Sequence, residues 1–352
     1  MNHNVYRAVI TILLSGIGFL TLQQLNAHSH YGSEQPGGFK RIIRGKAVIN
    51  HVFPTKSNYY SAGTANGKCY FYAANPRDII VLDSNFDAGI LELPKDSAIE
   101  RFSYAYKARL YSEGMEFYAI NKASIYCVDM NTLNISKINV PRNYSRIIRI
   151  SPNSYIVKGF DSLYRSQQLY KLTVGQGYQR LSKAILPEAG DIGFATDGNL
   201  FYDSISHQVI YVFLNCNQVL HLDTSLNILY RKSTVDTVSN PKIIAKKLLN
   251  KDNKAFYSYT KPTEYVNYTC CLHRGILYVN SLLKADNENI NDFRENSVID
   301  VYAVKNGKYL SSFYLPKYMH EGVKSIEVLD DKILATYQNA IISFSLAKPN
   351  YP

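Results

Sequence analysis

The chain has 352 residues, of which 46% are hydrophobic, so it can bury one large core or two ordinary ones and is not an intrinsically disordered protein. Its formal net charge of +11 favours anionic partners. Nucleic acid is not expected among them, because the basic residues are scattered and form a cluster only at 242–254.

The first 27 residues have the order of an export signal, which we predict over residues 1–27. Arg7 supplies positive charge, residues 8–22 are uncharged and apolar, and Ala27 is a small residue suited to cleavage. The apolar run is shorter than the roughly 20 residues that span a bilayer. We therefore expect a periplasmic or secreted mature protein without a membrane span. The alternative is a membrane anchor formed by an uncleaved N-terminal segment.

The mature chain is predicted to begin with a flexible stretch, residues 28–38, followed by a single domain over residues 39–352. "FKRIIRG" (39–45) indicates an isolated strand. Residues 57–94 then form a group of four strands rich in β-branched and aromatic residues: "SNYYSAG", "KCYFYAAN", "DIIVLDSN" and "AGILELP". The middle strands are almost continuously apolar, which is typical of a sheet packed on both faces.

Part of this group is repeated along the chain. "FYAANPRDIIVLDSN" (71–85) returns as "FYAINKASIYCVDMN" (117–131) and as "YVFLNCNQVLHLDTS" (211–225), and residues 154–173 occupy the place of a degenerate copy. Each clear copy has an asparagine eight residues before an aspartate: Asn75 and Asp83, Asn121 and Asp129, Asn215 and Asp223. Because every repeat needs a turn former and only one needs a catalytic group, we interpret these side chains as turn formers.

Prolines end four of the repeated units, at Pro94, Pro141, Pro187 and Pro316. Proline cannot donate a ladder hydrogen bond, so each should end an outermost strand. Four strands in each period of 40 to 50 residues indicate a β-propeller. We count six blades, the last with three strands, and expect residues 39–45 to supply its fourth and close the ring. A seventh blade would have to lie in residues 236–263.

This pattern resembles the six-bladed propellers of exported bacterial proteins, of the broad TolB-like or NHL-like type, over essentially the whole mature chain. The resemblance implies an all-β fold and carries over no cofactor or catalytic residue. The chain has no tryptophan, so it lacks the tryptophan docking motif of quinoprotein dehydrogenases and the dipeptide of WD repeats.

Five cysteines in a long exported chain do not indicate a disulfide scaffold. Cys69 and Cys127 lie in apolar runs and are expected to be small buried side chains. Cys270 and Cys271 are neighbours whose side chains should point to opposite faces of a strand, so we predict structural thiols. A strained disulfide between them, or a metal site with His273, is the alternative.

The histidines do not indicate a catalytic or metal site. We expect His221, between two leucines in a strand, to be a hydrogen-bonded residue between blades. His207 and His320 fall in predicted loops, and His320 with Glu321 would be an acid and base pair without a third group to orient it. We find no motif for phosphate binding, nucleophilic catalysis or zinc, and therefore predict no catalytic residue, metal or cofactor.

The binding surface is predicted from two insertions, residues 236–263 and 281–297, that flank the fifth blade on one face. The first carries six Lys against two Asp, and the second carries four acidic against two basic residues. Long loops on a rigid scaffold commonly carry function. With the regular loops of that face, the predicted site comprises Arg77, Lys122, Arg142, Tyr144, Lys246, Lys247, Asp286, Arg294 and His320.

The sequence therefore predicts an exported, monomeric, non-catalytic propeller that binds a protein or an anionic polysaccharide of the cell envelope. The alternative is a propeller hydrolase or lyase with its site at the central channel. An enzyme should bring several ionisable side chains, or a metal, together at the mouth of that channel.

Overall fold

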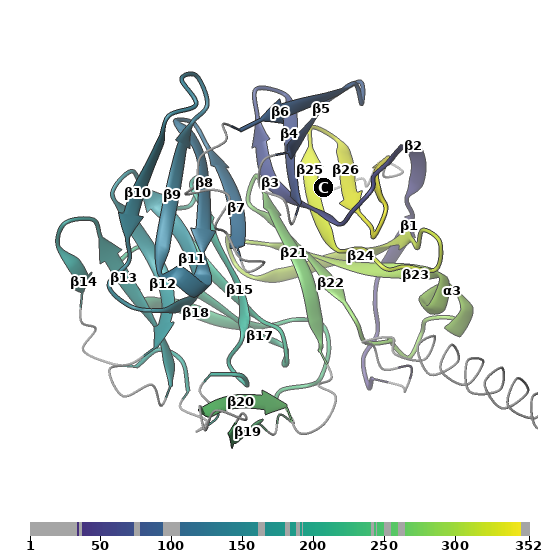
Figure 1. Ribbon diagram of the computed structural model, residues 1–352. Helices are drawn as coiled ribbons and strands as arrows, with labels where there is room; N and C mark the ends of the chain where they lie inside the picture. The colour runs from purple at the N-terminus through teal and green to yellow at the C-terminus, as the bar shows by residue number, and fades with distance from the viewer. Residues whose placement is uncertain are drawn as a thin grey trace, which may run out of the picture.

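The computed structural model is an all-β propeller of six blades, as predicted (Figure 1). It describes residues 34, 37–73, 78–93, 106–160, 166–179, 184–187, 191, 193–240, 243, 245–249, 255–259 and 265–345. The predicted export signal and Pro94 lie outside this part of the chain. Within the described residues, no helix has both the length and the apolar character needed to cross a membrane.

The first four blades are each made of four consecutive antiparallel strands, which run in order from the channel outward. Blade one contains β3 (Tyr59–Ala65), β4 (Lys68–Ala73), β5 (Asp78–Asp83) and β6 (Ala88–Glu92). Blade two contains β7 (Tyr106–Tyr111), β8 (Gly114–Ala119), β9 (Ser124–Asp129) and β10 (Ile135–Asn139), with the short helix η1 (Ile120–Lys122) between β8 and β9. Blade three contains β11 (Tyr144–Ser151), β12 (Ser154–Phe160), β13 (Gln167–Thr173) and β14 (Gly177–Gln179). Blade four contains β15 (Gly198–Asp203), β16 (Gln208–Phe213), β17 (Gln218–Leu222) and β18 (Ile228–Ser233).

The last two blades include the N-terminal strands. Blade five contains β21 (Asn267–His273), β22 (Ile276–Ser281), β23 (Asn296–Ala303) and β24 (Lys308–Pro316), and β1 (Ile43–Lys46) adds a fifth, parallel strand outside β24. Blade six contains β25 (Ser325–Leu329), β26 (Lys332–Thr336) and β27 (Ala340–Ser345), and β2 (Val48–Pro54) pairs with β27 to complete it.

Closure by an N-terminal strand is thus confirmed, but the predicted segment, residues 39–45, is wrong. The strand that closes blade six is β2, and the earlier segment runs along blade five before the chain reaches blade six. Both segments contain β-branched residues, Ile42 and Ile43 in the first and Val48, Ile49 and Val52 in the second, so the sequence allows a strand at either place. As a consequence, Pro316 ends a strand that β1 covers, and it does not mark an exposed edge.

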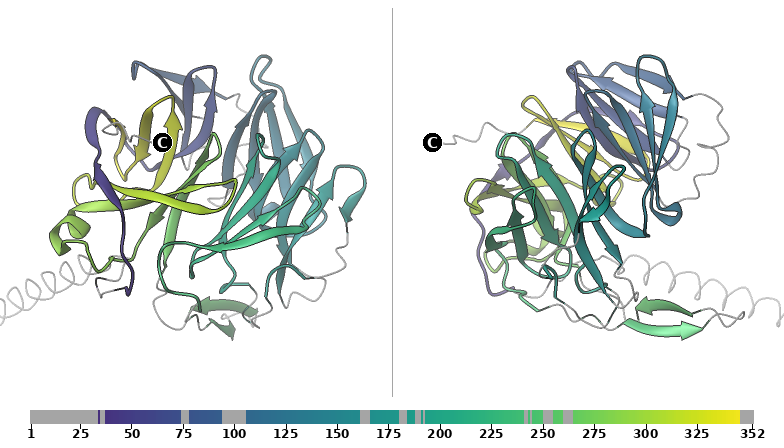
Figure 2. Two further views of the ribbon diagram at one scale, coloured as in Figure 1. Left: turned by 180° about the vertical axis from the view of Figure 1, so that it is seen from behind. Right: turned by 90° about the vertical axis from the view of Figure 1, so that its left-hand side faces the viewer.

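Residues 236–263 do not form a seventh blade within the described part of the chain. They contain a separate hairpin of β19 (Ala245–Leu249) and β20 (Ala255–Tyr259), which lies outside the ring of blades (Figure 2). The insertion at 281–297 contains the helix α3 (Ile290–Glu295), where the side chain of Asn289 accepts a hydrogen bond from the Asn291 N–H at 2.8 Å.

The core is formed by blades that pack face to face. Between blades one and two, for example, Ile79 and Tyr72 pack with Met115 and Phe117, all fully or almost fully buried. The apolar middle strands therefore bury both faces, as their composition predicted. All five cysteines are free thiols, and no group of three or more metal-binding side chains occurs in the described residues.

The repeated aspartates form the turns that the sequence predicted. Asp83 accepts from the N–H groups of Asn85 and Asp87, Asp129 from Asn131 and Thr132, and Asp223 from Ser225 and Asn227, at 2.8 to 3.0 Å. Asn215 acts differently, because its amide donates to the Phe194 carbonyl 3.2 Å away in the loop before β15. This asparagine therefore fixes a longer-range contact and not its own turn. Asn75 lies outside the described residues, as does the side chain of Asn121.

His221 is buried in blade four. Its Nδ1 lies 3.3 Å from Gln208 Oε1, and its ring stacks on Tyr230 with centroids 4.1 Å apart. Both partners belong to the same blade, so the predicted hydrogen bond lies within a blade and not between blades. Burial lowers the pKa of His221 to about 4.

This pKa gives a prediction for acid stability. The folded-state pKa lies below the ordinary value of 6.5, so stability is lost as the pH falls from 6.5 through about 4. We expect His221 to remove about 3 kcal/mol from the free energy of unfolding over that range. Between pH 7 and pH 4.5, the His221→Gln variant should lose less of its free energy of unfolding than the wild type. Urea denaturation at both pH values would measure the two losses. Equal losses in both proteins would contradict the prediction.

Candidate functional site

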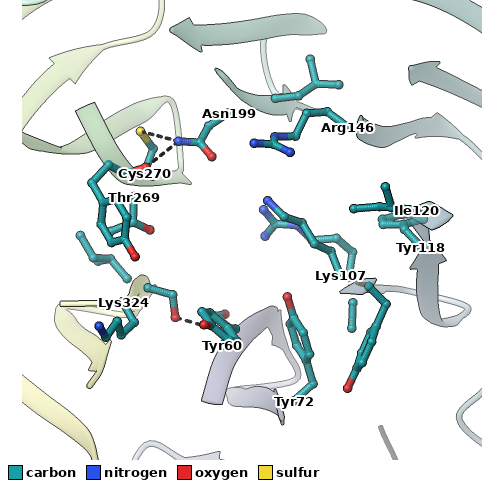
Figure 3. Close-up of a pocket in the computed structure, with 18 of the residues that line it drawn as sticks. Tyr60, Tyr72, Lys107, Tyr118, Ile120, Arg146, Asn199, Thr269, Cys270 and Lys324 are labelled. Carbon is teal, nitrogen blue, oxygen red and sulfur yellow. Dashed lines mark hydrogen bonds between the residues drawn. The ribbon is translucent and has the colours of Figure 1, made fainter. Parts of the chain in front are cut away.

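A cavity of about 850 Å³ occupies the end of the central channel where the innermost strands begin (Figure 3). Every blade contributes to its wall: Ser61 from β3, Lys107 from β7, Arg146 from β11, Asn199 from β15, Cys270 from β21 and Ser325 from β25. Ile120 of η1 also lines it, so the cavity lies at the end of the ring that carries the loops between second and third strands.

The charged side chains of the cavity wall are mostly cationic. The described lining residues include four cations, Lys107, Arg109, Arg146 and Lys324, and one carboxylate, Asp197. Alternation along β7 explains two of them, because Tyr106 and Ala108 pack into the core while Lys107 and Arg109 point the other way, into the channel. The formal charge of the wall is 4 − 1 = +3, so the cavity is suited to an anion.

Asp197 is held between two cations. Arg146 donates from Nη2 to Asp197 Oδ2 at 2.8 Å, and Lys158 Nζ lies 3.5 Å from Oδ1. Burial raises the pKa of Asp197, but Arg146 and Lys158 lower it further, and the result lies below the usual range. Asp197 therefore stays ionised and is a poor proton acceptor.

Lys158 and Arg146 are fixed by the same cluster. Lys158 is fully buried, and its Nζ also donates to the Gly193 carbonyl at 3.1 Å. Burial lowers the pKa of Lys158 to about 8, against the attraction of Asp197. Arg146 also donates to the carbonyls of Gly198 at 2.7 Å and Ser145 at 2.9 Å. Its guanidinium is thus a rigid part of the wall.

Lys107 is exposed to the cavity but enclosed by the ring of blades. This enclosure, with the positive charges of Arg146 and Arg109, lowers the pKa of Lys107 to about 7, while Asp197 opposes the shift. Figure 3 shows the lysine and Arg146 converging on the same space. The pKa of this amine therefore lies well below that of an ordinary lysine.

Aromatic side chains form another part of the wall. The ring centroid of Tyr72 lies 5.9 Å from that of Tyr60 and 5.5 Å from that of Tyr106. The Tyr60 ring is partly exposed. Arg109 lies over the ring of Phe201, 6.0 Å from its centroid. Such a wall offers flat faces and hydroxyl groups beside the cations, which suits a ligand with both a ring and a negative charge.

None of the predicted binding residues that the structure describes lines this cavity. Lys122 and His320 are exposed, Arg142 lies 6.0 Å from the ring of Tyr178, and buried Tyr144 donates from its hydroxyl to the Ser124 carbonyl at 2.9 Å. Glu321 pairs with Lys324 at 3.5 Å. Arg77 falls outside the described residues, as do the side chains of Lys246 and Lys247 on β19.

Asp286 and Arg294 contact the N-terminal segment of the chain itself. Asp286 Oδ1 accepts from the Gly38 N–H at 3.1 Å, and Arg294 forms two hydrogen bonds with Glu34, at 2.8 and 2.6 Å. These contacts give both residues a structural role that the sequence did not indicate. Their role in binding a partner stays a prediction.

The sequence does contain a signal for the cavity. In "YKARLY" (106–111), Lys107 and Arg109 occupy alternate positions of a strand that begins a blade. Charged residues at alternate positions of an innermost strand can face the channel when the positions between them are core, as Tyr106 and Ala108 are.

Comparisons with known proteins extend to the fold only. No protein-family model matches the sequence, and no curated protein matches it. A member of the DUF4221 family from Bacteroides vulgatus has a TM-score of 0.54 at 12% identity, covering 85% of this chain and 97% of that one. Virginiamycin B lyase from Staphylococcus aureus, a catalytically inactive form with quinupristin, has a TM-score of 0.49 at 11% identity, covering 86% and 98%. The likeness to the DUF4221 member shows a shared fold and no more.

Proposed function

We propose that this protein is an exported binding protein that holds an anionic ligand in its central channel. The observation that carries the proposal is the excess of cations in the cavity wall, four against one carboxylate. Arg109 and Lys107 form no ion pair with a carboxylate among the described residues, although Glu327 and Asp197 are close enough to interact with them electrostatically. Both cations are therefore available to an anion. Export rests on the signal-like residues 1–27 and places the ligand in the cell envelope or outside the cell.

The ligand class that best suits the wall is the end of an acidic polysaccharide. Guanidinium and ammonium groups bind carboxylate or sulfate through charge-assisted hydrogen bonds. The exposed ring of Tyr60 would pack against a sugar ring. Binding is favoured over acid and base catalysis because Asp197, the cavity's carboxylate, is already held by Arg146 and Lys158.

A propeller hydrolase or lyase remains the second candidate. The convergence of ionisable side chains at the channel favours it, since this is the feature that we expect of an enzyme. Lys107 is its best proton acceptor, because burial and the neighbouring guanidiniums lower its pKa to about 7. Release of shortened or unsaturated sugars from the acidic polymer would distinguish catalysis from binding.

Calorimetry tests the proposal. An acidic oligosaccharide such as an oligogalacturonate should bind, and its neutral galactose counterpart of equal length should bind at least about 10-fold more weakly. Lys107→Ala and Arg109→Ala should each lower the affinity by about 10- to 100-fold. Arg142→Ala, which removes an exposed cation outside the cavity, is the matched control. Equal binding of both sugars, or an equal effect of the control, would refute the proposal.

We also propose that the two insertions beside blade five form a separate surface for a protein partner. The buried Glu288 of the second insertion pairs with Arg41, so deleting the insertion would damage the fold. Crosslinking from the native envelope should therefore compare wild type with Asp286→Ala and Arg294→Ala, and unchanged partner recovery would contradict a role for these residues.

A further inference from the structure

Lys107 differs from the other cations of the cavity wall. Arg146 is bonded to Asp197, Lys324 pairs with Glu321 at 3.5 Å, and Arg109 lies over Phe201. The Lys107 amine has no hydrogen bond or ion pair with any residue that the structure describes. It lines a cavity of about 850 Å³.

Charged and titratable groups face this amine from several blades. Arg109 lies on the same strand, Arg146 on β11, Asp197 directly before β15, and the Cys270 thiol on β21. The two guanidiniums disfavour a third positive charge, and Asp197 opposes them only in part because it is shared with Arg146 and Lys158. Burial raises the pKa of Cys270 to about 12, so the thiol is neutral and does not offset them.

We propose that Lys107 is a reactive amine that binds small anionic carbonyl compounds, such as 2-oxo acids, covalently as an imine. The neutral Nζ attacks the carbonyl carbon, and the carbonyl oxygen takes up a proton to give a carbinolamine. Loss of water then leaves the imine, so one water is released and nothing is oxidised or reduced. Arg109 and Arg146 line the same space and would pair with the carboxylate of the bound compound.

The chain contains a natural comparison in Lys158. Burial lowers its pKa as well, to about 8, yet its Nζ is fully buried and donates to Gly193 and Asp197. An amine in that position has no access to a carbonyl compound. Selective reaction at Lys107 therefore requires both the cavity and the free amine, and a depressed pKa alone does not make a lysine reactive.

Reductive trapping tests the inference on the full chain. The protein is incubated at pH 7 with cyanoborohydride and either glyoxylate, which is anionic, or acetaldehyde, which is uncharged, and modified lysines are mapped by mass spectrometry. We expect glyoxylate to modify Lys107 at least about 10-fold faster than any other lysine, since most lysines are about 99.9% protonated at this pH. The rate should rise with an apparent pKa near 7.

This inference rests on the proposed function only where it expects a preference for anions. Different results would contradict the reactive amine and the anionic ligand. Labelling that follows surface exposure, with Lys107 no faster than exposed Lys308, overturns the reactive amine even if acidic sugars bind. Selective labelling by acetaldehyde without a preference for glyoxylate overturns the anionic ligand and with it the proposed function. Lys107→Arg, which keeps the charge, should abolish the selective adduct and leave the other lysines unchanged.

Discussion

Replacing Arg41 by alanine will lower the free energy of unfolding by about 3 to 5 kcal/mol. The Arg41 guanidinium is buried, with side-chain exposure of 0%, and pairs with Glu288 and, at 2.8 Å, with Asp300. It also donates to Ser281 Oγ at 2.7 Å and to the Leu283 carbonyl at 2.8 Å. Without Arg41, the buried carboxylates of Glu288 and Asp300 would have no cation beside them. Leaving them unpaired costs more free energy than the intact ion pairs contribute to stability.

The position of Arg41 explains why the effect should extend to ring closure. Two residues later the chain enters β1, which covers blade five, and then β2, which completes blade six. Loosening this anchor therefore weakens the closure of the propeller as a whole. Urea denaturation of both proteins at pH 7 measures the change.

Arg294→Ala is the matched control, because it removes an exposed arginine that pairs with Glu34 in the same N-terminal segment. An exposed pair of this kind contributes about 0 to 1 kcal/mol. If Arg41→Ala were no more destabilising than this control, the buried pairs would not anchor the N-terminus as argued.

Replacing Asp197 by alanine will also destabilise the protein by about 3 to 5 kcal/mol. The reason is Lys158, which is fully buried and has Asp197 as its carboxylate partner at 3.5 Å. Without Asp197, the ammonium either stays charged without a partner or loses its proton, and both states cost free energy. Arg146 loses its ion pair in the same variant.

A double-mutant cycle isolates the contribution of Lys158. Lys158→Met removes the buried charge and keeps a side chain of similar length, so it should recover much of the stability that Asp197→Ala loses. Urea denaturation of the wild type, the two single variants and the double variant gives the coupling energy. A double variant less stable than Asp197→Ala alone would show that the carboxylate acts mainly through Arg146 and the cavity wall.

The sequence by itself determined the repeated part of the fold. The aspartates Asp83, Asp129 and Asp223 fix their turns through hydrogen bonds two to four residues along the chain. Interactions over so short a range can be inferred from spacing alone. Alternation and β-branched composition likewise predicted four strands for each blade and apolar surfaces on both of its faces, because these depend on the local strand period.

Only the tertiary structure decided where the ring closes and where the charges meet. β1 and β2 follow each other closely in the chain, and their different partners, β24 and β27, lie roughly 270 to 300 residues away. Lys107, Arg146 and Asp197 come from different blades, and their convergence depends on how the blades are placed around the channel. Asp286 and Arg294 contact residues roughly 250 positions earlier. Contacts between such distant residues leave no spacing pattern in one sequence, because they arise from the packing of complete blades and not from the period of any strand.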